Sequence, residues 1–345
     1  MLHAGEDVKA AIRKLQIQSE LWTIRYFVDT SKIFRFLQSL PNLQIFEFAQ
    51  EGQIIKLKQL PLLIDSLRHA PISELLLNTG DYSEVDGPPP EGLSSLKKLS
   101  ITWSVGDAED VPGSSIDHLI RLIRPSLNTL IQLKIENLPR ETSADLDLFS
   151  LRDAGNTLRV FAYTMRNHDE GVLDVIPEIF PHLRKLALTW SIERWVKDYS
   201  LPWKDAYLHS LSNNTNVEDL QLSFDFEEEA RDRVSNDEDY AWYIRCYRRR
   251  LTATTKVSEA MPKVRNCAWL QLHTARNYSS SMLHPFVIEK RAHASEGGEP
   301  IGVVRGFKQQ WMGSFKYFWV TGAMVDCRLE SLPGTIIGEN EPEAY

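Results

Sequence analysis

A short pattern of apolar positions recurs along most of the chain. Each copy holds an apolar residue, two variable residues, a second apolar residue, one variable residue and a third apolar residue. Alternation of this kind is typical of a β-strand that buries one face, so each copy predicts a strand. The central apolar residues of the nine copies are Leu15, Phe46, Leu75, Leu99, Leu133, Phe161, Leu186, Leu220 and Cys267.

The copies follow one another at intervals that suit a repeated structural unit. Most central residues lie roughly 25–35 residues apart, which is close to or slightly above the length of a leucine-rich repeat. Two copies, LKKLSITWSV at 96–105 and LRKLALTWSI at 183–192, are nearly identical. The number of copies, their spacing and this close match favour a true repeat over chance.

The stretches between the copies carry the apolar pattern of helices. In 114–124, apolar residues recur three and four positions apart, Ser114 and Asp117 form a capping pattern, and Pro125 follows. Comparable stretches precede Pro41, Pro71 and Pro181. Each unit thus predicts a strand, a loop, a helix and a turn. Stacked units give an α/β leucine-rich-repeat solenoid, with a parallel sheet on its concave face and helices on its convex face.

Two regions depart from the repeat. An acidic run at 227–239 leads into a stretch that predicts one long helix, with Ser235 or Asn236 as its N-cap. The tail from His273 lacks the pattern, and its aromatic residues and the run Gly302–Val304 predict short strands. We therefore expect repeats in 1–272, a β-rich capping region in 273–338 and a disordered tail in 339–345.

The first predicted strand, Ile12–Ile17, lies at the open end of the expected sheet. Terminal repeats need a polar cap, because an uncovered apolar end promotes aggregation. Either Met1–Ala11 forms a small helical cap, or a domain upstream of this chain covers the end.

Composition narrows the class of partner and the cellular location. The net charge of -8 and the pI near 5.7 argue against nucleic acid as a partner, since its binders present a basic face. No apolar run reaches the roughly 18 residues of a membrane span, and the N-terminus is too charged for a signal peptide. Cys246, Cys267 and Cys327 are far apart and odd in number, which fits a reducing compartment. We expect a cytoplasmic or nuclear protein without a membrane partner.

The repeats resemble the leucine-rich-repeat portions of fungal-type F-box proteins. The resemblance is carried by their irregular spacing, by Pro-His-Leu-Arg-Lys-Leu at 181–186 and by the aromatic tail. In that family the repeats choose a substrate, and an N-terminal F-box docks onto a ubiquitin ligase. An F-box opens with Leu-Pro-x-Glu and apolar helix residues, and no such segment precedes the first repeat here. Leu138-Pro139-Arg140-Glu141 matches these letters but continues with Thr-Ser-Ala-Asp.

The resemblance therefore implies a protein–protein interaction module that recognises a substrate protein. Ubiquitin-ligase components are further partners if an F-box lies upstream.

Motifs for catalysis or cofactor binding are not found in the sequence. The nine histidines form no HExxH motif or Cys/His cluster, and the glycine-rich stretch 297–302 lacks the Lys-Ser/Thr that grips phosphate. We therefore expect no cofactor, no metal site and no enzyme activity. The carboxylates of 227–239 suit a solvated loop better than a calcium site, because they lack EF-hand spacing. Arg245 and Arg248–Arg250 either pair with this loop or contact phosphate.

The variable residues of each copy are predicted to point out of the concave face. Their polar types are mixed and no charge dominates, which suits a protein partner better than a polyanion. Trp103 and Trp190 hold equivalent positions, and they either point into the core or anchor a partner. The candidate binding residues are Lys98, Ser100, Thr102, Trp103, Lys134, Glu136, Thr189, Trp190, Gln221 and Ser223.

Two other functions stay open beside the receptor module. One is a stand-alone repeat scaffold or regulatory protein without a ligase role. The other is an enzyme whose site lies in the aromatic tail, which requires a pocket with convergent carboxylates or histidines at 273–330.

Overall fold

The structure is a computed structural model, and the chain divides into two compact units, Met1–Asn167 and His168–Tyr345. The residues that it describes are 5–19, 30–50, 55–56, 60–80, 93–103, 120, 123–136, 147–165, 171–190, 202–224, 226, 236–275, 278–291 and 301–306.

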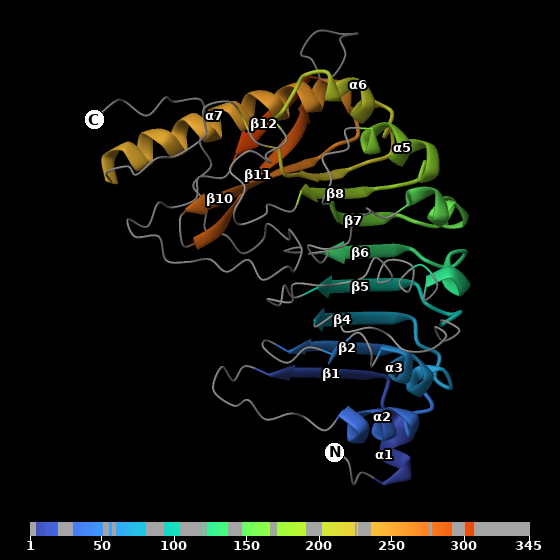
Figure 1. The fold of residues 1–345 in the computed structure, drawn as a ribbon. Coiled ribbons are helices and arrows are strands. Elements are labelled where there is room, and N and C mark those ends of the chain that lie inside the picture. Colours follow the sequence, from blue (N-terminus) through green and yellow to red (C-terminus); the bar gives the residue numbers. More distant parts are fainter. Residues whose placement is uncertain are drawn as a thin grey trace. The chain divides into compact units, whose positions relative to one another are not determined.

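The first unit is built on a parallel sheet. Its main strands are β1 (Lys14–Ser19), β2 (Ile45–Gln50), β4 (Glu74–Gly80), β5 (Lys98–Trp103), β6 (Gln132–Glu136) and β7 (Val160–Met165). They lie side by side in chain order, each parallel to its neighbours (Figure 1). A short strand, β3 (Ile55–Lys56), also pairs with β4.

The register of these strands follows the apolar pattern of the sequence. Central residues are direct partners of one another from strand to strand, and all are buried: Leu15, Phe46, Leu75, Leu99, Leu133 and Phe161. The apolar residues two positions later form a second row behind them, with Leu77, Ile101 and Ile135 buried at its middle. The prediction that each copy forms one strand of a parallel sheet is confirmed for this unit.

The backbone repeats one hydrogen-bonding motif at the start of each strand. The carbonyl oxygen two residues before a central residue accepts hydrogen bonds from two successive N–H groups of the next unit. Lys97, for example, accepts from Ile131 at 2.7 Å and from Gln132 at 3.0 Å. The same motif uses the carbonyl oxygens of Arg13, Gln44, Ser73 and Ile131. Identical local geometry in successive units explains why their strands share one register.

Side chains in the turns add hydrogen bonds between successive units. The amide of Asn42 donates to the carbonyl oxygen of Ala10 at 2.9 Å, and the hydroxyl of Thr129 donates to that of Leu96 at 2.9 Å. Both side chains stand four residues before a central residue. A polar residue at this position therefore satisfies a carbonyl group of the preceding unit, a role that the sequence did not reveal.

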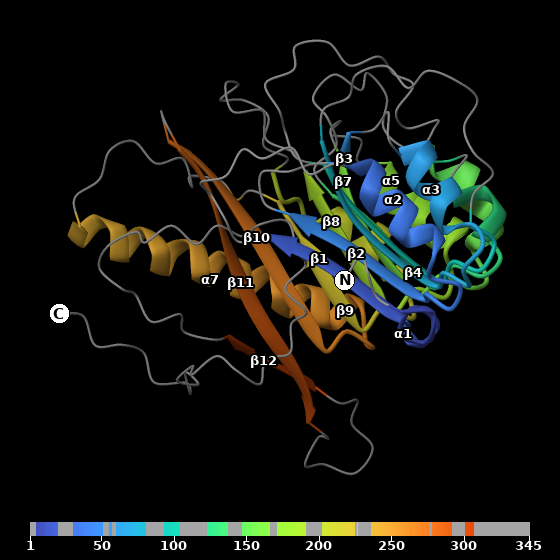
Figure 2. The same ribbon diagram turned by 90° about the horizontal axis from the view of Figure 1, so that it is seen from below.

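Helices of the first unit lie on one face of its sheet, where α2 (Thr30–Gln38) packs against α3 (Leu60–Leu67) (Figure 2). Two later connections contain 3-10 turns, η2 (Arg124–Ser126) and η3 (Leu148–Ala154). The helix predicted at 114–124 lies mostly outside the described residues, although Ile120 and Ile123 are helical and buried. At the N-terminus α1 (Glu6–Ala11) lies within 1–11, the stretch named in one of the two alternatives for covering the first strand, but it buries none of its residues and leaves Val8 56% exposed.

The second unit begins with parallel strands and continues with antiparallel ones. Its elements are α5 (Val172–Ile179), β8 (Lys185–Trp190), α6 (Tyr207–Ser212), β9 (Asp219–Leu222), α7 (Asn236–Ala260), β10 (Asn266–Ala275), β11 (Tyr278–Arg291) and β12 (Ile301–Gly306). Strands β8, β9 and β10 are parallel, with Leu186, Leu220 and Cys267 as partners in the register. Strands β11 and β12 follow antiparallel. The short strand expected at Gly302–Val304 is β12, whereas β11, with 14 residues, is longer than the short strands expected in the tail.

The long helix α7 is present and begins at Asn236, directly after Ser235, one of the two predicted N-cap residues. The predicted boundary between repeats and capping region lies at 272/273. It falls inside β10, whose last residues pair with the start of β11. The sequence placed the boundary at the end of the apolar pattern, whereas the strand continues for as long as β11 offers it backbone partners. The tail 339–345 lies outside the described residues. Both units are thus α/β with an open strand order, which is parallel in the first unit and mixed in the second.

Candidate binding surface

The variable residues of the repeated apolar pattern lie on one face of the first unit's sheet. This face points away from α2 and α3. Along β5, Leu99 and Ile101 are buried, whereas Lys98 is exposed and Ser100 and Thr102 are half-buried. Successive side chains of a strand point to opposite faces, so these polar residues share the outer face. This outer face is the surface on which the candidate residues of the first unit lie.

Lysines on this face have acidic neighbours on adjacent strands. The Lys98 ammonium lies 2.7 Å from the carboxylate of Glu74, its direct partner on β4. The Lys14 ammonium on β1 lies 3.8 Å from the carboxylate of Glu47 on β2. Exposed pairs of this kind contribute only about 0–1 kcal/mol each to stability. Their larger effect is that positive and negative charges balance along the face.

Five candidate residues are brought together on β5 and β6 and form what we call the β5–β6 patch: Lys98, Ser100, Thr102, Lys134 and Glu136. Ser100 is the direct partner of Lys134, and Thr102 is that of Glu136. The Thr102 hydroxyl donates a hydrogen bond of 3.2 Å to Glu136 Oε2. The patch therefore combines a hydroxyl pair with charged groups of both signs.

Two candidate residues are less exposed than predicted. Glu136 keeps only 9% of its exposure and Ser223 only 6%, so both are buried. The prediction considered alternation along a single strand, but neighbouring strands also cover an outer-facing side chain. Glu136 lies on an inner strand, where Thr102 holds its carboxylate from β5. Its carboxylate is therefore a buried part of the β5–β6 patch and does not project from the surface.

The two candidate tryptophans were predicted to lie just past their strands, but both are the last residue of a strand. Trp103 is the last residue of β5 and Trp190 the last of β8. The orientations of both rings lie outside the described residues. Whether they point into the core or toward a partner therefore stays a prediction.

The remaining candidates, Thr189, Gln221 and Ser223, belong to the second unit. Gln221 is half-buried between Ala187 and Ala268, its buried partners on β8 and β10. One row nearer the start of these strands, the Lys185 ammonium lies 2.6 Å from Asp219, which accepts a 2.6 Å hydrogen bond from Asn266. The parallel strands of this unit thus also place a neutralised polar row on one face.

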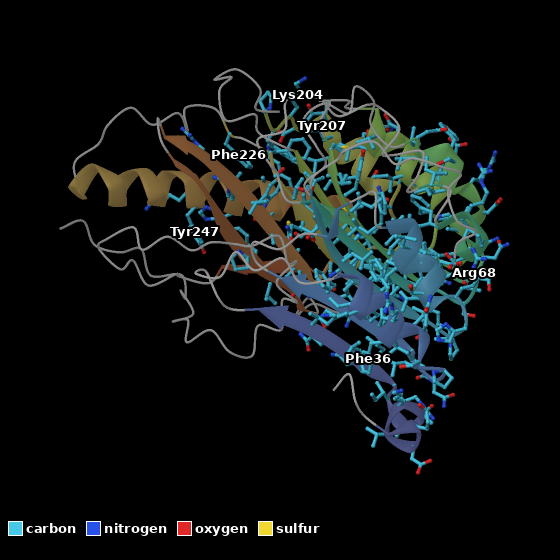
Figure 3. The ribbon with its side chains drawn as sticks, turned by 60° about the horizontal axis from the view of Figure 1, so that its bottom comes forward. Phe36, Arg68, Lys204, Tyr207, Phe226 and Tyr247 are labelled. Atoms are coloured by element: carbon cyan, nitrogen blue, oxygen red, sulfur yellow. The ribbon has the colours of Figure 1, made fainter. Side chains whose placement is uncertain are left out.

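An aromatic cluster in the second unit was missed by the sequence analysis. Trp203 meets Trp269 edge to face, with 5.0 Å between ring centroids, and Phe226 meets Trp269 in the same way at 5.3 Å. Tyr207 stacks on Phe224, with 5.0 Å between ring centroids. Figure 3 labels Tyr207 and Phe226 of this cluster. Trp203 and Phe226 lie in irregular segments, where no periodic pattern marks them.

The long helix α7 is fixed to this cluster by buried polar groups. The Trp269 indole N–H donates a 2.7 Å hydrogen bond to the Thr254 hydroxyl, which donates in turn to the Arg250 carbonyl oxygen at 2.8 Å. The Arg250 guanidinium is buried and lies over the Phe226 ring at 4.8 Å. Arg250 is therefore part of the core. The acidic residues 227–235, with which the arginines were predicted to pair, lie outside the described residues.

Two titratable side chains in the described part of the second unit, Cys267 and Asp205, have pKa values shifted by their contacts within the fold. Complete burial raises the pKa of the Cys267 thiol to about 12, so the thiol stays protonated at neutral pH. The hydrogen bond from Lys256 lowers the pKa of Asp205 and ties α7 to the segment before α6. Among the residues that the structure describes, no three His, Cys, Asp or Glu side chains are grouped to hold a metal ion.

Comparisons with known proteins do not add a family or a relative. No protein-family model matches the chain, and no curated protein matches its sequence.

Within the described ranges, every helix is too short or too polar to cross a membrane.

Proposed function

We propose that the protein is an interaction module, a leucine-rich-repeat solenoid that binds another protein through the outer face of its first sheet. The β5–β6 patch carries this proposal. Its side chains range from exposed to buried, its hydroxyl groups lie between charges of both signs, and Glu74 on β4 pairs with Lys98. Protein interfaces have this mixed polar character, whereas surfaces for polyanions carry an excess of cations.

The architecture supports the leucine-rich-repeat assignment without depending on the resemblance. The central residues of the repeated pattern are direct partners from β1 to β7, and the start of each strand repeats one hydrogen-bonding motif. A sheet of equivalent strands offers a row of side chains at intervals of about 4.8 Å, which suits a partner that lies across several units.

We further propose that the partner is a substrate protein and that the module serves as the recognition part of an F-box-type ubiquitin-ligase receptor. The alternative is a stand-alone scaffold or regulatory protein. Capture of the naturally expressed protein from native lysate, followed by identification of the bound proteins, distinguishes the receptor from the scaffold. Ubiquitin-ligase components among the bound proteins support the receptor, and their consistent absence beside a stable partner supports the scaffold.

The binding face is tested with two variants that add the same charge to the first unit. Ser100→Arg places a long cation in the middle of the β5–β6 patch, and we expect it to weaken binding of the captured partner about tenfold or more. Asn156→Arg makes a matched change at an exposed turn before β7 and should leave binding unchanged. Equal affinities of both variants and the original chain, with equal melting temperatures, would contradict this choice of face.

A further inference from the structure

The turns that lead into β5, β6 and β7 form a basic edge of the first unit. These strands start side by side along one edge of the sheet (Figure 1). The charged side chains in 93–98, 123–132 and 155–160 are all basic: Lys97, Lys98, Arg124 and Arg159. Lys98 is paired with Glu74. None of the other three forms an ion pair with an acid among the residues that the structure describes. In a chain with a net charge of -8, this edge is an exception.

An exposed apolar residue lies among these cations. Ile131 is 41% exposed, Lys97 is exposed and Arg159 is half-buried. All three hold the same position of the repeated pattern, two residues before a central residue. The Ile131 N–H donates to the Lys97 carbonyl oxygen at 2.7 Å, and the Arg159 N–H donates to that of Ile131 at 2.8 Å. Successive members are therefore one strand spacing apart, about 4.8 Å, and we call the three residues the strand-start row.

The same positions of the second unit are filled differently. They hold Arg184, Glu218 and Arg265, joined by the same backbone hydrogen bonds at 2.7 Å and 2.8 Å. The Glu218 carboxylate lies 4.0 Å from the Arg184 guanidinium, so the middle residue balances its basic neighbours. In the strand-start row this acid is replaced by an exposed isoleucine. Two cations on either side of an apolar side chain suit a partner that supplies both carboxylates and an apolar contact.

We propose that the strand-start row binds an acidic amphipathic helix of a second protein. The helix lies along the edge, with an apolar side chain on Ile131 and carboxylates at Lys97 and Arg159. These two cations are two strand spacings apart, roughly 10 Å. Residues i and i+7 of a helix are about 10.5 Å apart along its axis, and i+4 lies between them on the same face. An extended segment does not match, because its residues on one face repeat at about 6.8 Å.

The local geometry of Arg159 suits a carboxylate. Its Nη1 donates hydrogen bonds to the carbonyl oxygens of Asn156 at 2.9 Å and Leu158 at 3.0 Å, which hold the guanidinium at the turn. A guanidinium has five N–H donors, so others can serve a partner. A polyanion fits less well, because Ile131 occupies the place where a third cation would be needed. The row is distinct from the β5–β6 patch, so either surface can fail its test without the other.

The experiment is a fluorescence-anisotropy titration of the full chain against labelled helical peptides at low salt, where exposed charges are least screened. The probe is an alanine-rich peptide of about 20 residues, long enough to form a helix, with Glu, Leu and Glu at i, i+4 and i+7. The control peptide has the same composition, with Leu moved to i+2 on another face. The original chain should bind the probe at least about tenfold more tightly than the control peptide.

Variants of the full chain test the site. Ile131→Glu gives the row the central acid of the second unit, and Lys97→Glu reverses one of its charges. Each should weaken binding of the probe by about tenfold or more. Arg265→Glu makes the same charge change at the equivalent position of the second unit and should leave binding unchanged. The double variant Lys97→Glu, Arg159→Glu should bind a peptide with Lys in place of both Glu residues more tightly than the original chain does. Equal melting temperatures show that the variants fold.

A chain that does not distinguish the probe from the control peptide overturns the proposal. So does binding that Ile131→Glu and Lys97→Glu leave unchanged, or that Arg265→Glu weakens as much. A single-stranded oligonucleotide of about ten nucleotides should bind at least about tenfold more weakly than the probe. Equal or tighter binding of the oligonucleotide, weakened by Lys97→Glu, would assign the row to nucleic acid and overturn the proposal as well.

Discussion

The two units fill the same apolar pattern with different side chains. In the first unit the two strand rows are mostly leucine, isoleucine and phenylalanine, and equivalent residues have nearly equivalent neighbours. In the second unit the pattern ends in Trp269, which meets two other aromatic rings and a threonine hydroxyl from α7. The contrast indicates that stability is spread evenly over the first unit and concentrated at one point in the second.

The largest effect should come from Trp269, the fully buried tryptophan of the second unit. Trp269→Ala removes a fully buried ring and its hydrogen bond, and we expect it to lower the free energy of unfolding by about 3–5 kcal/mol. Urea unfolding followed by circular dichroism measures this loss. Trp203→Ala is the comparison, and its cost should be smaller because the Trp203 ring is half-exposed. Equal losses would contradict the expectation that burial of the ring decides the cost, since Trp203 also contacts several rings of the cluster.

Even distribution in the first unit predicts similar losses at equivalent positions. Leu75→Ala, Leu99→Ala and Leu133→Ala should each lower the free energy of unfolding by about 2–5 kcal/mol, within about 1 kcal/mol of one another. Leu15→Ala should cost less, because Leu15 lies on the edge strand. The same denaturation experiment provides the test. One leucine that dominates the others would show that the units are not equivalent.

A smaller effect should separate two neighbouring threonines of α7. Thr254→Val removes the acceptor of the buried Trp269 indole N–H, at an expected cost of about 1–3 kcal/mol. Thr255→Val is a matched change on the same helix, but the Thr255 hydroxyl only donates to the Leu251 carbonyl oxygen of its own helix. Its cost should stay below about 1 kcal/mol. If the two variants unfold alike, the polar link between α7 and β10 is unimportant.

The smallest effect concerns pH. Burial raises the pKa of Cys267 from 9.0 to about 12, so the folded state holds this proton more tightly than the unfolded state. The resulting stabilisation is complete below pH 9 and is lost as the pH rises from 9 toward 12, by about 1 kcal/mol at pH 10. Unfolding at pH 8 and pH 10 should therefore show a smaller alkaline loss in Cys267→Ala than in the original chain. Identical losses would mean that the thiol titrates normally.

Strands could be predicted from the sequence because their apolar residues are constrained by direct partners on both sides. Leu99 and Leu133 must be apolar and evenly spaced if their strands are to share one core, so the pattern is visible in the chain. The end of β10 carried no such mark, since β11 extends it through backbone pairing that does not depend on residue type.

The candidate surface was predicted in part for a related reason. Alternation along β5 and β6 placed Ser100, Thr102, Lys134 and Glu136 on one face, where the structure pairs Ser100 with Lys134 and Thr102 with Glu136. It could not give the depth of Glu136, because burial of an outer-facing side chain depends on what neighbouring strands place beside it. The partners of Trp269 were hidden for another reason, as Trp203 and Phe226 come from segments without any period.

Lysine acetylation of the free chain and of its complex with the captured partner tests directly whether the partner binds the β5–β6 patch. Lys98 and Lys134 lie in the β5–β6 patch, and Lys256 on α7 of the second unit serves as the internal reference. Mass spectrometry of the two samples gives the acetylation rate of each lysine. The account predicts that the partner slows acetylation of Lys98 and Lys134 and leaves that of Lys256 unchanged. Unchanged rates at Lys98 and Lys134, with protection elsewhere, would show that the partner binds another surface.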